Sequence, residues 1–190
     1  MIKLIRKLPL LFLFLALSPN SGEADLLKTL IDKMNSVESI RANITIDNTL
    51  TGSMSYKRPN LLHVKLSDGR VISANGRFLW FYSPNKAIAG KQDLDGSTGG
   101  ISGLLSGYKD VTVSGNTILL KSRDRYYEEI KVVVDGNNML QAIRLKTRDQ
   151  NFKNISLSGI QVNIGLASNL FNLHPPASAQ IIENPLNEKQ

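Results

Sequence analysis

The sequence contains no cysteine among its 190 residues. Disulfide bonds, thiol catalysis and thiolate metal sites are therefore excluded, and the chain has no cysteine to which a lipid anchor attaches. Histidine is also scarce. Only His63 and His174 occur, and neither has a carboxylate or a second histidine at the spacing of metal ligands. We therefore expect no metal site.

A convergent set of acid, base and nucleophile is missing as well. The G-x-S-x-G motif of serine hydrolases is absent, and Ser102 in the sequence G-I-S-G does not have its spacing. Glu128 and Glu129 are adjacent on an expected strand, so their side chains point to opposite faces and do not act as a pair. We therefore expect that the protein is not an enzyme.

The N-terminus has the order of a secretory signal peptide. A basic segment precedes an apolar run from Leu8 to Leu17, and small and polar residues follow at 18–24. The apolar run is about half as long as the roughly 20 residues of a membrane-spanning helix. We predict a signal peptide over 1–22, a periplasmic protein, and a single domain over 23–190. An uncleaved membrane anchor is the alternative.

The charge is moderate once that segment is removed. The chain carries +7, and loss of Lys3, Arg6 and Lys7 leaves +4. The remaining basic residues are scattered and alternate with apolar ones, as on the solvent face of strands. We therefore expect no nucleic-acid partner.

Hydrophobic periodicity then separates helix from strand. Apolar residues at helical spacing predict an amphipathic helix from Ala24 to Ser36, and the period changes to two at Ile40. Alternating segments bounded by turn residues predict six strands before Asp95 and five after Gly107. The tail from His174 is poorly patterned, and we expect it to lie along the surface.

Two local features qualify this pattern. The glycine-rich segment from Asp95 to Gly107 contains apolar residues at i, i+3 and i+4, which predicts a short helix of weak propensity lying across the sheet. Ile160 and Val162 are out of phase with Leu157, and Gly159 lies between them, so we expect a bulge there.

The predicted fold class is mainly β (α+β). A long antiparallel sheet of about eleven strands is expected to twist and curl into an unclosed β-barrel or half-barrel. One concave face is then apolar, and the N-terminal helix and the short central helix are available to cover it.

Several stretches resemble the LolA family of periplasmic lipoprotein carriers. Residues 56–61 read Y-K-R-P-N-L, and residues 79–84 read L-W-F-Y-S-P, which match two family motifs in order and spacing. The helix end and first strand at 36–45 and the segment 169–176 resemble the corresponding parts of the family.

The resemblance implies an unclosed barrel with a helical lid over an apolar cavity, without catalysis or cofactor. It implies that acylated lipoproteins are received from an inner-membrane ABC transporter and delivered to an outer-membrane acceptor, and that the carrier is a monomer. Arg58 matches the family arginine that holds the lid closed through backbone carbonyls. The candidate cavity residues are apolar: Leu62, Val64, Phe78, Trp80, Tyr82, Ile101, Leu104 and Leu105.

Two other functions remain open from the sequence. The same half-barrel architecture serves periplasmic lipid- or lipoprotein-sensing regulatory domains, and a purely structural envelope protein needs no apolar cavity. Co-purifying lipid distinguishes the first two functions from the third. Release of cargo to a membrane acceptor distinguishes the carrier from the sensor.

Overall fold

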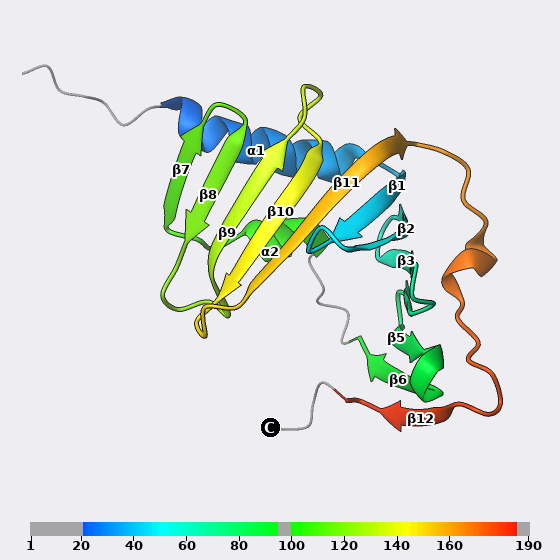
Figure 1. The fold of residues 1–190 in the computed structure, drawn as a ribbon. Helices are drawn as coiled ribbons and strands as arrows, with labels where there is room; N and C mark the ends of the chain where they lie inside the picture. Colours follow the sequence, from blue (N-terminus) through cyan, green and yellow to red (C-terminus); the bar gives the residue numbers. More distant parts are fainter. Residues whose placement is uncertain (1–20, 95–99, 186–190) are drawn as a thin grey trace, which may run out of the picture.

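The computed structural model describes residues 21–94 and 100–185. The predicted signal peptide lies almost wholly outside these residues. Within them, one curled sheet carries the helices Ser21–Ser36 and Gly100–Leu105 on one face, as Figure 1 shows. No helix in the described ranges is long and apolar enough to span a membrane.

The elements follow the predicted order closely. The helical elements are α1 (Ser21–Ser36), η1 (Pro84–Lys86), α2 (Gly100–Leu105) and η2 (Ser168–Phe171). The strands before α2 are β1 (Ser39–Ile46), β2 (Leu50–Lys57), β3 (Leu61–Leu66), β4 (Val71–Asn75), β5 (Phe78–Ser83) and β6 (Ile88–Asp93). Those after it are β7 (Asp110–Ser114), β8 (Thr117–Lys121), β9 (Tyr127–Val134), β10 (Leu140–Thr147), β11 (Phe152–Val162) and β12 (Gln180–Glu183).

The strands of the described residues form a single sheet in the order β12-β6-β5-β4-β3-β2-β1-β11-β10-β9-β8-β7. The fold class is confirmed, with one correction. The tail contributes a twelfth strand, β12, which pairs parallel with β6, so the sheet is mixed rather than wholly antiparallel. The four residues of β12 lie about ninety positions after their partners in β6. A segment of four residues is too short to show the alternation that predicts a strand.

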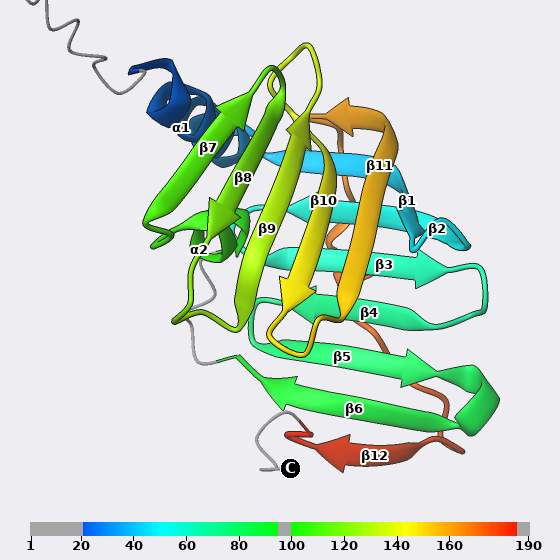
Figure 2. The same cartoon turned by 60° about the vertical axis from the view of Figure 1, so that its left-hand side comes forward.

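The sheet curls so that its two halves cross. In Figure 2, β7–β11 cross in front of β1–β4, and the C-terminal segment between β11 and β12 passes behind β2–β5, while β12 itself lies beside β6. Phe171 in that segment is fully buried, and its carbonyl accepts a hydrogen bond of 2.9 Å from Ser73 Oγ of β4. The C-terminal segment therefore covers one face of the β1–β6 half. We call this face of the sheet the outer face and the opposite face the inner face.

The bulge predicted at Gly159 is confirmed. The pairing of β1 with β11 shifts register between Arg41 and Asn43, and Gly159 has a φ of +59°. Asn43 lies against the position that a Cβ at Gly159 would take. The shift returns Ile160 to the inner side, where it packs with Ile40 and Ala42.

Candidate functional site

The inner face of the sheet is apolar across both halves. Leu62 of β3 lies opposite Tyr56 of β2, which lies opposite Ile40 of β1, and Val64 is connected in the same way through Met54 to Ala42. Because Ile40 and Ala42 are directed inward, Leu62 and Val64 lie on the inner face as well. Three buried clusters follow one another along this face, and Leu157 of β11 packs against all three. The inner face is therefore one continuous apolar surface.

The short helix α2 lies over the β7–β10 end of this surface. Leu105 is buried at 1 % exposure and belongs to the same cluster as Leu30 of α1 and Leu120 of β8. Leu104 is partly buried against that cluster. The predicted weak helix is thus present, and a helix of six residues depends on such contacts because it is too short to be stable alone. The side chain of Ile101 lies outside the described residues.

The end of α2 is held by an arginine that the sequence reasoning missed. Arg125, in the β8–β9 connection, donates a hydrogen bond of 2.7 Å from Nη2 to the carbonyl of Ser106, and its guanidinium lies 5.7 Å from the ring centroid of Tyr108. Gly107 has a φ of +75°, and the guanidinium occupies the space that a Cβ there would need. Tyr108 donates to the carbonyl of Tyr127 at 2.9 Å, and burial raises the pKa of Tyr108.

Arg58 follows the last residue of β2 and is exposed. Its backbone N–H donates to the carbonyl of Glu38 at 2.9 Å, which fixes the chain at this point. Among the described residues, its guanidinium makes no hydrogen bond or ion pair. The lid-latch role of Arg58 stays a prediction.

The eight predicted cavity residues do not share one face. Trp80 lies opposite Ser73, which lies opposite His63, and this row is on the outer face of the sheet. Phe78 and Tyr82 are each two residues from Trp80 along β5, so their side chains lie on the same face as that of Trp80. All three aromatic side chains are therefore directed away from the face of Leu62 and Val64. The placement of all three in one cavity with Leu62 was wrong.

The strand β5 instead presents Leu79 and Phe81 to the inner face. Leu79 lies opposite Ala74, which lies opposite Leu62. The sequence did not indicate which side chains of β5 are directed inward, because the residues on both of its faces are apolar or aromatic. The outer aromatic residues have polar neighbours: Lys91 Nζ lies 4.5 Å from the ring centroid of Phe78 and 6.0 Å from that of Trp80.

His63 lies on the outer face between Ser55 and Ser73. Its Nδ1 is buried and has no hydrogen-bond partner among the described residues. Burial lowers the pKa of His63, and the charge of Lys65 lowers it further. No group of three or more His, Asp or Glu suited to a metal ion occurs in the described ranges.

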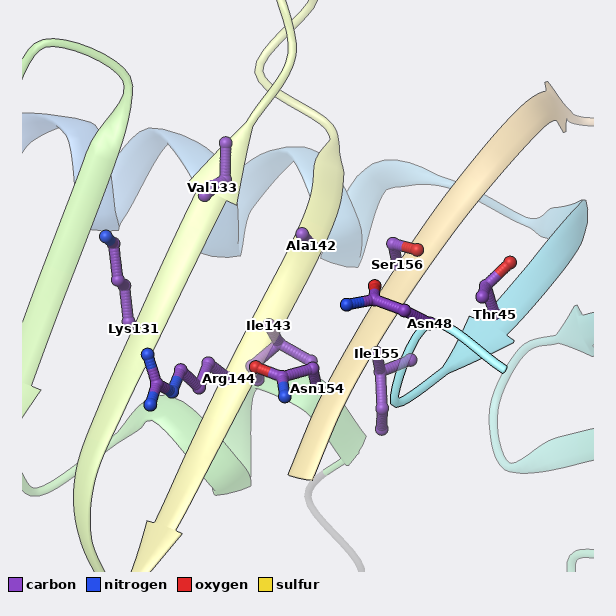
Figure 3. Close-up of a pocket in the computed structure, with 10 residues that line it drawn as sticks. All are labelled: Thr45, Asn48, Lys131, Val133, Ala142, Ile143, Arg144, Asn154, Ile155 and Ser156. Carbon is purple, nitrogen blue, oxygen red and sulfur yellow. The ribbon is translucent and has the colours of Figure 1, made fainter. Parts of the chain in front are cut away.

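A hollow lies on the outer face of the sheet where the two halves meet. Figure 3 shows it from the side opposite α1, which runs behind the strands. It has a volume of about 420 Å³ and lies over β1, β11, β10 and β9. Its polar lining comprises Thr45, Asn48, Asn154, Ser156, Lys131 and Arg144. We call this hollow the outer groove.

An open, curled sheet whose apolar inner face lies under short helices defines a half-barrel protein suited to binding apolar ligands. The sequence profile of the family described as outer membrane lipoprotein carrier protein LolA matches residues 40–174. The chain belongs to the LolA family, which confirms the resemblance noted in its sequence.

Individual relatives are distant but cover nearly the whole chain. The chain is 25 % identical to the outer-membrane lipoprotein carrier protein of Francisella tularensis, over 94 % of this chain and 98 % of that protein. It is 23 % identical to the protein of the same name from Nitrosospira multiformis, over 90 % and 95 %. An uncharacterized conserved protein from Thermus thermophilus has a similar fold, with a TM-score of 0.57 at 8 % identity over 85 % of this chain and 99 % of that one.

Proposed function

We propose that this protein is a periplasmic carrier that binds the acyl chains of lipoproteins and moves them from the inner membrane to the outer membrane. The observation that carries the proposal is the continuous inner apolar face, which is buried under α1 and α2 at β8–β10. At β2–β5 this face still has partly buried side chains, Met54, Leu62 and Phe81, beside the buried Val64 and Leu66. The family membership of the chain supports the same function.

Incomplete burial suits a protein that must release its ligand. Burying one methylene group contributes about 0.8 kcal/mol, so full burial of two or three acyl chains would amount to tens of kcal/mol. Cargo held so tightly would not pass to another site. A partly covered face with a small displaceable helix gives a lower affinity, because the cargo first displaces α2 from its own apolar contacts.

In this proposal the cargo comes from an inner-membrane ABC transporter and goes to an outer-membrane acceptor. The signal peptide over 1–22 directs export, and Arg58 stabilises the closed lid. An arginine serves this purpose because its guanidinium donates several hydrogen bonds in a fixed geometry. Leu62, Val64, Leu104 and Leu105 contact the acyl chains when the lid opens.

The test is release of a newly lipidated lipoprotein from spheroplasts. We expect a soluble one-to-one complex between the cargo and this protein, and transfer of that cargo to outer-membrane vesicles. Arg58→Leu is expected to load cargo but to unload it poorly. Arg70→Leu serves as the control, since the ion pair of Arg70 within the described residues is with Asp68 in the adjacent turn. Cargo that stays with the membranes contradicts the carrier function, and loading without any transfer indicates a sensor.

A further inference from the structure

Two cations face each other on the outer side of the sheet. Lys131 of β9 and Arg144 of β10 are directly opposed in the antiparallel register, and both are exposed. Like charges in opposed positions destabilise a strand pair. The next outward pair along these strands is Lys146 opposite Glu129, which have opposite charges. The unfavourable pair is therefore confined to one position in the ladder.

Neither cation is neutralised by the protein. Among the described residues, no carboxylate pairs with Lys131 or Arg144, whereas Lys146 pairs with Glu128 at 2.6 Å and Lys121 with Glu129 at 3.8 Å. Asp47 is next to Asn48 of the outer groove. Its carboxylate is already held by Lys153 Nζ at 2.7 Å and by the backbone N–H of Asn154 at 2.9 Å.

Hydrogen-bonding groups lie on one side of the two cations, over β11 and β1 (Figure 3). In the β1–β2 turn, Asp47 and Asn48 have φ values of +50° and +60°, as in a type I′ turn, and Figure 3 shows the Asn48 side chain reaching over the sheet. Thr45 and Ser156 are paired side by side on β1 and β11. Two cations with amide and hydroxyl groups in a hollow of about 420 Å³ suit a phosphate-bearing ligand of modest size.

An exposed aromatic ring lies on the same face. Phe152 is 41 % exposed, Arg144 Cζ lies 4.1 Å from its ring centroid, and Lys146 Nζ lies 5.8 Å from it. Tyr126, which is 74 % exposed, lies in the β8–β9 connection at the same end of the sheet (Figure 1). Aromatic rings beside basic residues are typical of surfaces that contact a membrane interface.

The connections at this end are themselves close to neutral. Arg148 donates to the carbonyl of Arg123 at 2.8 Å, which joins the β8–β9 and β10–β11 connections, but Asp124 and Asp149 accompany these arginines. The positive charge therefore resides in the outer groove, and the aromatic rings lie beside it.

We propose that the outer groove binds the phosphate of an anionic phospholipid, and that the β9–β11 face docks the protein on an anionic membrane surface. Lys131 and Arg144 contact the phosphate, Asn48 and Ser156 hydrogen-bond its oxygens, and Phe152 lies at the depth of the headgroups. This site is on the opposite side of the sheet from the inner apolar face, so the proposal does not depend on the carrier function.

The test is co-sedimentation of the exported protein with vesicles of phosphatidylcholine alone or with about one third phosphatidylglycerol. We expect binding only to the anionic vesicles, and loss of that binding at about 0.5 M salt, where charges are screened within a few ångströms. Each basic residue at an anionic surface contributes a factor of about five. Lys131→Gln with Arg144→Gln is therefore expected to lower the partition coefficient about 25-fold.

The matched control is Lys33→Gln with Lys109→Gln, which removes two exposed charges outside the outer groove. We expect it to reduce binding less than about threefold, and Phe152→Ser to reduce it a few-fold. Circular dichroism checks that each variant is folded.

The proposal is overturned if both double variants lose binding equally, or if the protein binds neutral vesicles as well as anionic ones. It is also overturned if inorganic phosphate binds in the outer groove while vesicles do not, which would indicate a soluble anion. Binding of polyglutamate but not of vesicles, again dependent on Lys131 and Arg144, would indicate an acidic protein partner instead.

Discussion

The two halves of the sheet differ in how completely their inner faces are covered. On β8 and β9, Ile118, Leu120 and Ile130 are 0 % exposed beneath α1 and α2. On β2 and β3, Val64 and Leu66 are also buried, at 6 % and 5 % exposure, but their inward neighbours Met54 and Leu62 are only partly buried. One half thus completes its hydrophobic core with its own chain. The other half retains apolar surface that a ligand can still cover.

This difference separates residues that stabilise the fold from residues that are available for binding. A side chain that is already buried gains nothing further from an apolar ligand, whereas a partly exposed one gains in proportion to the area that the ligand removes from water. We therefore expect the β2–β5 half to tolerate substitution better in folding and worse in cargo binding.

The largest effect is expected from one substitution made in each half. Leu120→Ala creates a cavity in a closed core and is expected to cost about 2–5 kcal/mol of unfolding free energy. Leu62→Ala is expected to cost about 1 kcal/mol, because part of its surface is already exposed. Urea denaturation measures both costs, and the spheroplast assay is expected to show weaker cargo release with Leu62→Ala. Equal costs would show that the two halves are equally closed.

The next effect concerns the end of α2. Gly107→Ala is expected to cost about 1–2 kcal/mol, because alanine is strained at a positive φ and its methyl group meets Arg125. Arg125→Gln removes the hydrogen bond to the Ser106 carbonyl and leaves the core intact. Hydrogen exchange is expected to accelerate at residues 103–108 in both variants, with little change in β9. Uniform acceleration would contradict a local lid.

A smaller effect distinguishes the outer face of the β2–β5 half. The pKa of His63 is lowered in the folded state, so the unfolded state binds more protons at mildly acidic pH. His63 therefore contributes stability that is present above its unfolded pKa of about 6.5 and is lost as the pH falls below it. Between about pH 7.5 and about pH 5.5, Tm is expected to fall more in the unsubstituted protein than in His63→Gln. Parallel pH profiles would exclude His63 as the cause.

The smallest effect lies on the outer face of the closed half. Lys131→Gln with Arg144→Gln relieves the repulsion of opposed like charges and is expected to raise the unfolding free energy by about 0.2–1 kcal/mol at low salt. The gain should disappear at high salt, because exposed charges are then screened. Destabilisation measured by urea denaturation would show that these side chains stabilise the sheet.

Much of the fold could be predicted from local patterns. The hairpin turn at Asn75-Gly76, the apolar spacing of α1 and the phase change at Gly159 are each encoded by a few neighbouring residues. The strand β12 could not be predicted in this way, since its strand partner in the described part of the chain is the distant β6 and its four residues have no readable pattern.

The site was only partly predictable for a related reason. Alternation on β3 correctly placed Leu62 and Val64 on one face, but β5 is apolar on both faces, so only its register against β4 assigns Trp80 outward. Arg125 belongs to no motif, and its contact with Ser106 depends on how a turn meets a helix end. The opposition of Lys131 and Arg144 likewise depends on the register of β9 with β10.

The most direct test of the inner face as the cargo site uses two adjacent residues of β5. A photo-crosslinking phenylalanine analogue is placed at Phe81, which is directed inward, or at Trp80, which is directed outward. Both positions are aromatic and half-buried, so the two variants are matched in size and burial. Acylated lipoprotein is expected to crosslink to position 81 and not to position 80. Crosslinking at position 80 alone would contradict binding on the inner face.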